Sequence, residues 1–359
     1  MKYFYALVPL TVLLSSIRLF GAVRAIEAIV FLAIIFSLVR LAKFSKVRTQ
    51  TFLVSITCLA MVLIGLLHAS AESISYSLRA IFALSLFHLT YRGGEIFGKE
   101  IDYRFLLLIF VSLYFASVYS YFWEYSFVFC SFVIIFYGER RYTWLILSVA
   151  MMFLVNQRAP IVAIFLYAGL KIMSHFSLIK VAGFFIAVAI AVVSAVYIPA
   201  ISESRVVSTL SMLSINNILQ AWNVAIAESI NTSYDVFVYD NRSLLTADGD
   251  LSAHLRIRKW SKAYTDFRWH NAIFGLGPGY FGRAADSGFI RLLVCYGAVV
   301  GVLFFTYMRS IYLEISHTGR GVLSVLLLSN LFLDLTFSVL VMGFSGWMVS
   351  YSRRFSENG

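Results

Sequence analysis

The chain has 359 residues, of which 60% are hydrophobic and only 13% are charged, and its mean hydropathy is +0.84. These values exclude a soluble enzyme, a disulfide-rich secreted scaffold and a disordered tail, and they indicate a polytopic membrane protein. The formal net charge of +11 does not indicate nucleic-acid binding, because the basic residues are scattered in short runs between apolar blocks. We therefore expect no nucleic-acid partner.

Apolar blocks long enough to cross a hydrocarbon layer of about 30 Å as helices recur along the chain. They predict about twelve transmembrane helices, at residues 3–19, 25–41, 51–68, 73–90, 104–120, 122–137, 142–155, 159–173, 181–199, 286–308, 321–335 and 337–350. The first block is interpreted as a span, since no signal-peptide cleavage site follows it. The two blocks within 142–173 are short, so a re-entrant pair is the alternative there. The predicted fold class is an all-α polytopic membrane protein.

The Lys and Arg residues of the short loops predict the orientation of the chain. One set of alternate loops is rich in cations: Lys2, Lys43, Lys46, Arg48, Arg92, Lys99, Arg104, Arg140, Arg141, Lys171, Lys180, Arg309, Arg320, Arg353 and Arg354. The opposite short loops contain only Arg18, Arg24 and Arg158. Both termini are therefore expected on the cytoplasmic side, and the one long connection on the outer side.

This long connection divides the chain into three predicted regions: a nine-span membrane region at 1–199, an outer loop at 200–285 and a three-span membrane region at 286–359. A loop of this length is either functional or disordered, and this one is rich in Trp and Tyr, which is not a disordered composition. Apolar residues recur with helical spacing at 215–230. The loop is therefore expected to form short amphipathic helices over the membrane face.

The three cysteines, Cys58, Cys130 and Cys295, each lie within an apolar block. Cysteines in such blocks behave as small hydrophobic residues, so we expect no disulfide and no metal site. The glycine-rich run at 275–282 matches neither a nucleotide phosphate-binding loop nor a dinucleotide-binding turn. No cofactor is expected.

Arginines are frequent in the outer loop and the spans beside it. A guanidinium group binds two phosphate oxygens at once, so such a cluster suggests a phosphorylated, membrane-bound substrate. The candidates are Arg79, Arg158, Arg256, Arg258, Arg268, Arg283 and Arg291. The alternative is ordinary solvation of a loop surface, where acidic residues balance the charge.

Three charged residues, Arg79, Arg291 and Asp334, lie within predicted spans, where an ionisable side chain usually faces a cavity or a partner. Arg79 lies about two helical turns from the outer end of its span, at a depth where a lipid diphosphate could be bound. A structural ion pair, for example with Asp334, is the alternative for Arg79.

The glycine-rich run, with Gly277 and Gly279 at its centre, allows the backbone to approach a substrate or a helix closely, or forms a plain turn. Asp286 and Ser287 follow it and predict a helix N-cap. Asp286 is alternatively a base or a ligand for a substrate hydroxyl. Further along, the spacing of Gly297 and Gly301 is typical of helix packing.

In this order, these features resemble the Wzy-type O-antigen and exopolysaccharide polymerases, which are related to the WaaL-type O-antigen ligases. The resemblance is carried by a small part of the chain: Arg256 or Arg258 with Trp260, the run Phe274 to Phe281, and Asp286-Ser287 leading to Gly297 and Gly301. The rest of the chain is similar only in architecture, with some twelve spans and a large outer loop.

The resemblance implies a metal-independent GT-C-type glycosyltransferase of the bacterial inner membrane. Its substrate would be an undecaprenyl-diphosphate-linked oligosaccharide, and a growing O-antigen, capsule or exopolysaccharide would be transferred onto a fresh repeat unit at the periplasmic face. A chain-length regulator, a flippase and membrane lipid are the implied partners. The catalytic candidates are Asp286, Arg268 and Arg291. The substrate-binding candidates are Arg79, Arg158, Arg256, Arg258, Arg283, Gly277 and Gly279.

Ligases of this family carry a histidine paired with Asn, Ser or Gln at the start of the span that follows the loop. The corresponding pair here is Asp286-Ser287, which favours a polymerase. A ligase that transfers polymer to the lipid A core remains the main alternative. A flippase would not need the long outer loop and would be expected to contain internal repeats, and a non-catalytic assembly partner is the last alternative.

Overall fold

The computed structural model describes residues 18–20, 23–24, 49–96, 126–154, 158–173, 215–230, 232–234, 237–238, 251–282, 285–331 and 333–351. The chain divides into two compact units, which are described separately: Met1–Tyr167 with His270–Gly359, and Ala168–Trp269. Four predicted spans, at 3–19, 25–41, 104–120 and 181–199, lie outside the described residues, except that the strand β1 overlaps the end of the first. The division into regions 1–199, 200–285 and 286–359 remains a prediction.

The described elements are helices, apart from the short antiparallel strands β1 (Arg18–Phe20) and β2 (Val23–Arg24). The first unit contains α3 (Thr49–Leu67), α4 (Ala71–Ile96), α6 (Ser126–Gly138), α7 (Tyr142–Leu154), α14 (Asn271–Phe274), α15 (Gly288–Glu314), α16 (His317–Ser329), the 3-10 helix η4 (Leu335–Phe337) and α17 (Val339–Tyr351). The second unit contains α12 (Ile215–Ser229) and α13 (Leu251–Asp266), and α8 (Arg158–Met173) crosses the boundary between the units.

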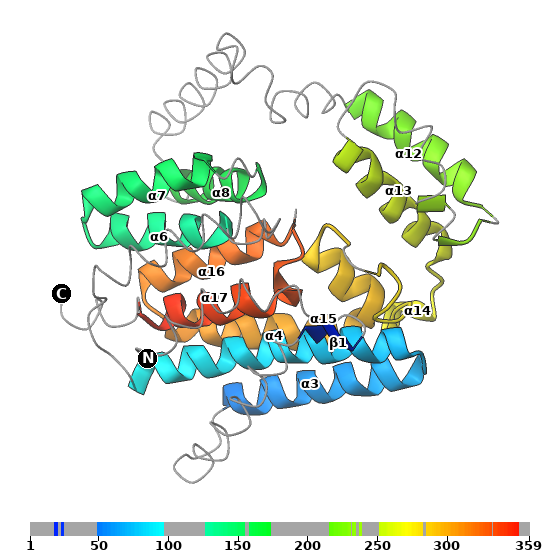
Figure 1. Ribbon diagram of the computed structural model, residues 1–359, viewed down its shortest axis with the longest axis horizontal. Coiled ribbons are helices and arrows are strands. Elements are labelled where there is room, and N and C mark those ends of the chain that lie inside the picture. Colours follow the sequence, from blue (N-terminus) through cyan, green and yellow to red (C-terminus); the bar gives the residue numbers. More distant parts are fainter. Residues whose placement is uncertain are drawn as a thin grey trace. The chain divides into compact units, whose positions relative to one another are not determined.

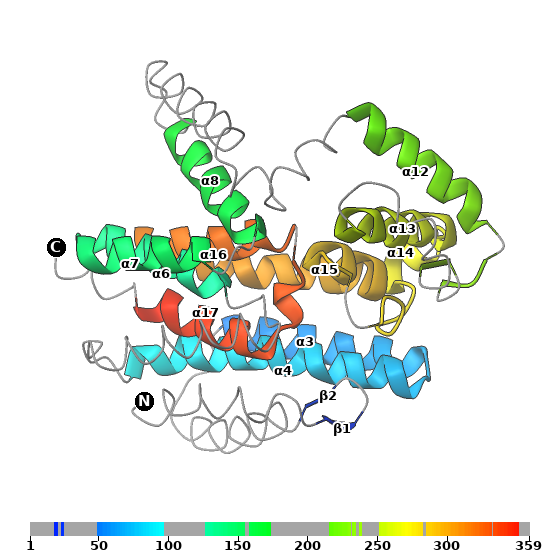
Figure 2. The same cartoon turned by 45° about the horizontal axis from the view of Figure 1, so that its top comes forward.

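In the first unit, α3, α4, α17, α16, α6 and α7 pack in succession, each against the next, as Figures 1 and 2 show. Helix α15 packs against α3 and α14. Helix α6 is mostly apolar and is buried on nearly all sides between its neighbours. The core of this unit is therefore built from helices far apart in the sequence.

Among the described helices, α3 and α15 are long and apolar enough to cross a membrane. On α3 the buried side chains form one stripe at helical spacing: Gln50, Val54, Thr57, Met61 and Ile64. Large apolar side chains occupy much of the remaining surface, and Phe52 is 58% exposed and Leu66 56% exposed. Because such a surface is costly in water, it is compatible with a membrane protein.

Glycine allows α17 to approach α4 closely. A Cβ at Gly346 would collide with the carbonyl oxygen of Phe87, and one at Gly343 would lie 2.6 Å from Cδ2 of Leu86. Contacts of this kind are typical of helices that pack within membranes, where small residues bring backbones together.

A buried polar network ties α3, α4 and α15 together. The imidazole of His88 on α4 lies 3.0 Å from the Tyr307 hydroxyl through Nδ1, and 3.3 Å from the Thr51 hydroxyl through Nε2. His88 is 5% exposed and Tyr307 is fully buried. Since an unpaired polar group would be expensive at this position, the network helps to fix the relative register of three helices.

The predicted span at 321–335 is wrong in its boundary, because α16 ends at Ser329. The buried Asn330 donates from Nδ2 to the carbonyl of Leu326 (2.9 Å), and its Oδ1 accepts from the backbone N–H and the hydroxyl of Thr336. An Asn side chain that bonds nearby backbone competes with helical hydrogen bonds. The chain therefore leaves the helix here and resumes it only at α17.

In the second unit, α12 and α13 pack together around Ala225, Phe237 and Val238. The helix predicted at 215–230 is confirmed as α12. Tyr234, Leu255 and Ile257 complete this small apolar cluster.

Candidate functional site

The glycine-rich run packs against a break in α15. Gly297 has φ +75°, which interrupts the helix, while Gly275 has φ +76°. A Cβ at Gly275 would collide with the backbone of Cys295, and a Cβ at Gly297 would collide with the backbone of Ile273. The two glycines therefore permit direct backbone contact between the run and the broken helix.

Hydrogen bonds fasten this contact. The N–H of Leu276 donates to the carbonyl of Val294 (2.7 Å), and the N–H of Gly277 donates to the carbonyl of Cys295 (3.1 Å). A helix break removes partners from nearby carbonyls, and here the glycine-rich run supplies them. Gly297 thus does bring a helix close to α15, because Ile273 and Phe274, whose backbone it contacts, belong to the short helix α14.

The other side of the glycine-rich run contacts the turn between α3 and α4. A Cβ at Gly277, which has φ +103°, would lie 2.9 Å from the ring of His68. At Gly279 it would lie 3.2 Å from Cγ of Glu72 and 3.3 Å from the backbone nitrogen of Ser73. Both predicted glycines are thus positions of close approach, confined between the α3–α4 turn and α15.

Arg291 is the central polar side chain of this region and is only 2% exposed. Its Nη2 donates to the carbonyl of Gly282 (2.7 Å), and its Nε lies 3.2 Å from Oδ2 of Asp334. The guanidinium also lies over the rings of Tyr76 and Phe337, 5.3 Å from each centroid. Arg291 therefore holds the end of the glycine-rich run, and its guanidinium is enclosed by protein.

Asp334 completes this arrangement. Its Oδ2 also accepts from the backbone N–H of Ala285 (3.0 Å), so one carboxylate binds both Arg291 and the chain just before α15. The ion pair suggested between Arg79 and Asp334 is replaced by the pair of Arg291 and Asp334. Sequence reasoning had identified both members as charges within spans but had not joined them.

The start of α15 differs in detail from the predicted cap. Ser287 is the N-cap and accepts from the backbone N–H of Ile290 (3.4 Å), and its hydroxyl donates to the carbonyl of Asn330 (3.1 Å). Asp286 lies outside the cap in a left-handed conformation, with φ +59°, and is half-buried. Non-glycine residues in this conformation cluster at functional sites. Asp286 therefore remains a candidate base or ligand for a substrate hydroxyl.

Arg79 lies on α4 and is half-buried. Glu72, Tyr76 and Arg79 are spaced four and then three residues apart, which places them on one face of the helix. Tyr76 on this face contacts Arg291, and Glu72 contacts the glycine-rich run. Arg79 therefore shares a face of α4 with these two residues, one turn beyond Tyr76.

In the second unit, Arg258 is 7% exposed and binds within its own unit. Its Nε and Nη2 donate to the carbonyl of Phe237 (3.1 and 2.9 Å), its Nη1 lies 3.3 Å from Glu228, and it stacks on the Phe237 ring. These contacts favour a role in holding α13 to its neighbours. Arg256 is half-buried, and Arg268 is exposed.

The side chains of two further candidates are not among those that the structure describes. Arg158 is the first residue of α8, and Arg283 lies outside the described residues. Arg79, Gly277, Gly279, Asp286 and Arg291 thus belong to the first unit, while Arg256, Arg258 and Arg268 belong to the second unit.

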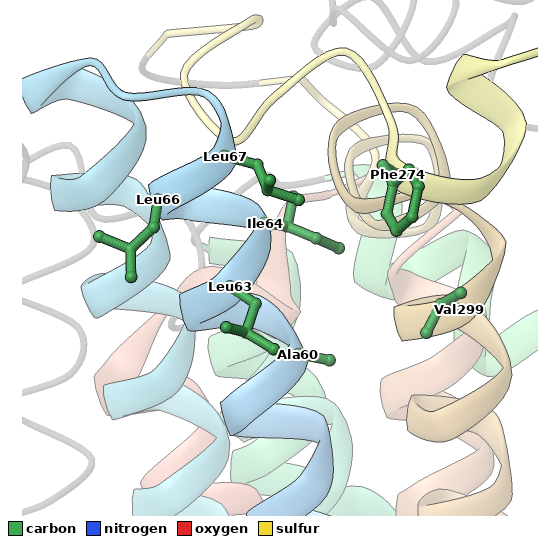
Figure 3. A pocket seen from close by; sticks show the side chains of 7 residues that line it. All are labelled: Ala60, Leu63, Ile64, Leu66, Leu67, Phe274 and Val299. Carbon is green, nitrogen blue, oxygen red and sulfur yellow. The ribbon is translucent and has the colours of Figure 1, made fainter.

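An apolar groove of about 440 Å³ lies beside this region. Figure 3 shows its lining, with α3 on one side and Phe274 and Val299 on the other. The α3 residues are Ala60, Leu63, Ile64, Leu66 and Leu67. Since Phe274 immediately precedes the glycine-rich run, the groove ends next to the polar contacts described above.

Sequence reasoning missed His68 and Glu72, which contact the glycine-rich run from the α3–α4 turn. The available signal was their position at the two ends of the short outer turn between the predicted spans 51–68 and 73–90, the second of which contains Arg79. The three cysteines are free, Cys130 and Cys295 being buried. Within the described ranges, no group of three or more His, Cys, Asp or Glu could hold a metal ion.

Comparison with protein-family models gives no match, and comparison with curated proteins gives none either.

Proposed function

We propose that this chain is a polysaccharide polymerase similar to the Wzy type. It transfers a glycan from undecaprenyl diphosphate onto a lipid-linked repeat unit at the periplasmic face of the bacterial inner membrane. The proposal includes about twelve spans, cytoplasmic termini and a GT-C-like metal-independent mechanism. What carries it is the contact of the glycine-rich run with α15 and with the start of α4. The run and the start of α15 are among the elements on which the sequence resemblance rests, and the same face of α4 carries Arg79.

The chemistry requires positioning and charge stabilisation more than bond-making groups of the protein. As the bond between the sugar and the diphosphate breaks, negative charge develops on the departing lipid diphosphate. Arg79 is the arginine of the first unit that we assign to this charge, because Arg291 is enclosed by Gly282, Asp334 and two rings. Arg291 and Asp334 act as positioning residues for the glycine-rich run.

The apolar groove supports a lipid-linked substrate. Each of its seven lining residues is apolar, and it lies between α3 and the segment that leads into the glycine-rich run. A hydrocarbon chain in this groove would gain favourable burial while its diphosphate remained near the polar region. Arg256 and Arg268 of the second unit are proposed for glycan or diphosphate contacts.

The test is a gel of surface glycans from a strain that lacks this chain and is complemented with wild type, Arg79→Ala or Arg268→Ala. Wild type should restore a ladder of polymer, whereas the two variants should leave single repeat units on the core at equal protein level. Arg309→Ala is the matched control, because Arg309 is an exposed arginine at the predicted cytoplasmic end of α15.

Two outcomes would contradict the proposal. A ladder that persists in the deletion strain would exclude polymerisation by this chain. Full-length polymer that accumulates on its lipid carrier, with none attached to the core, would assign the chain to the ligases instead.

A further inference from the structure

Three carboxylates lie around the glycine-rich run in the described part of the chain: Glu72, Asp286 and Asp334. Asp334 is engaged by Arg291 and by the N–H of Ala285. Asp286 is half-buried in a strained turn. Glu72 is exposed, and among the described residues no hydrogen bond or ion pair to its carboxylate is found. Of the three, Glu72 is the exposed carboxylate, which a ligand can reach from solvent.

The position of Glu72 is set by the run itself. A Cβ at Gly279 would meet Cγ of Glu72 at 3.2 Å, and a Cβ at Gly282 would lie 4.0 Å from its Oε1. The carbonyl of Gly282 is held by Arg291 (2.7 Å). The glycine-rich run therefore has the exposed carboxylate of Glu72 on one side and the pair of Arg291 and Asp334 on the other.

The distance along α4 between Glu72 and Arg79 fits a displacement at a sugar. Seven residues of helix separate their Cα atoms by about 10 Å on nearly the same face. In a displacement, the base oxygen, the acceptor oxygen, the anomeric carbon, the leaving oxygen and its cationic partner lie roughly in a row. With ordinary hydrogen-bond and near-attack distances, this row is about 10 Å long between the two side-chain ends, so two long side chains that start about 10 Å apart on one helix face can reach both of its ends.

We propose that Glu72 is the catalytic base of the polymerase, an inference that rests on the function proposed above. The Glu72 carboxylate takes the proton from the acceptor sugar's hydroxyl as that oxygen bonds to the anomeric carbon of the donor glycan. The bond from this carbon to the diphosphate oxygen breaks, and the diphosphate leaves with the electron pair toward Arg79. The proton on Glu72 then passes to water, which restores the carboxylate.

If Glu72 only stabilised the start of α4, another variant that weakens this helix start would reduce activity equally. An acidic residue in the first turn of a helix is stabilised by the helix dipole, and Glu72 occupies that turn of α4. Ser70 supports the same helix end, because its hydroxyl accepts from the N–H of Ser73 (3.0 Å). Ser70→Ala therefore weakens the helix start while leaving the carboxylate intact, which makes it the matched control.

The experiment uses the full-length protein in detergent with lipid-linked repeat units extracted from a strain that lacks it. Initial rates of chain extension are measured against substrate concentration. Glu72→Gln should lower kcat by about 100-fold or more, with KM little changed, since general bases contribute about 10²–10⁴ to rate. Ser70→Ala and Glu314→Gln, which removes an exposed carboxylate at the far end of α15, should retain most of kcat.

Two further variants separate catalysis from folding. Glu72→Asp keeps the carboxylate and should have a kcat between those of wild type and Glu72→Gln. Glu72→Ala should regain rate as formate is added, because a small carboxylate can occupy the vacated position. Inactivity of the wild-type protein would count against the proposed function. An active wild type with an equally active Glu72→Gln, or a loss reproduced by Ser70→Ala, would overturn the assignment of Glu72 alone.

Discussion

Each of the two units contains a buried arginine with the same three kinds of contact. Arg291 in the first unit and Arg258 in the second each donate to a backbone carbonyl, pair with a carboxylate and stack on an aromatic ring. The partners differ in exposure: the side chain of Asp334 is 12% exposed, whereas that of Glu228 is 36% exposed. The same contacts should therefore contribute very different free energies in the two units.

The two regions also differ in backbone. Around Arg291 the chain is broken at Gly297 and turns through several left-handed glycines, whereas Arg258 lies within the regular helix α13. An arginine in the first region holds an irregular segment in place. In the second region it joins a helix to its neighbours. This difference indicates that a buried arginine can either position a site or stabilise a scaffold.

The largest effect is expected for Arg291→Leu. Removing one member of a buried ion pair leaves Asp334 uncompensated, which costs about 3–5 kcal/mol of unfolding free energy. The double variant Arg291→Leu/Asp334→Leu should recover a substantial part of the lost unfolding free energy, because neither charge then remains buried. Denaturant unfolding of the purified proteins in detergent measures the unfolding free energies of the single and the double variant. A wild-type midpoint for the single variant would show that the pair contributes little.

An intermediate effect is expected for Gly297→Ala. An alanine at φ +75° is strained by about 1–3 kcal/mol, and its Cβ would collide with the backbone of Ile273. The glycine-rich run should be displaced, so polymer synthesis should fall more than protein level. Gly301→Ala is the control, since the Cβ there meets only the end of the Leu293 side chain. Equal amounts of polymer from Gly297→Ala and Gly301→Ala would contradict a role for the break of α15 at Gly297.

The smallest effect is expected for Arg258→Ala. Its ion pair with the partly exposed Glu228 is worth at most about 1 kcal/mol, and loss of the bonds to the Phe237 carbonyl brings the total to about 1–2 kcal/mol. Polymer synthesis should persist in proportion to the remaining folded protein. A stable but inactive Arg258→Ala protein would instead place this arginine in substrate binding and would remove the contrast between the two units.

The described helices show which of the predicted spans could be located from the local hydropathy of the sequence. The block at 51–68 corresponds to α3 at Thr49–Leu67, and the block at 142–155 corresponds to α7. The block at 73–90 ends earlier than α4, because hydropathy falls near Arg92 while the helix continues to Ile96. The short strands β1 and β2 were not predicted, since β1 overlaps the end of the predicted span 3–19 and β2 lies in the short loop before the predicted span 25–41.

The candidate site was predicted in part. Gly277 and Gly279 lie in the run whose end at Gly282 binds Arg291, and Arg291 is enclosed rather than open. Arg79 and Asp286 belong to the same unit, and their roles stay predictions. Glu72 was missed because an exposed glutamate beside a predicted span has an ordinary explanation at the level of sequence. Only its contact with the glycine-rich run distinguishes it from other surface carboxylates.

Helix content, apolar length and the presence of charges within spans follow from the amino-acid sequence, because hydropathy and helical periodicity are properties of neighbouring residues. The partner of Arg291, the break at Gly297 and the end of α16 at Ser329 depend on groups brought together from distant segments. Their energies come from burial and from hydrogen bonds across the fold, which no local pattern contains.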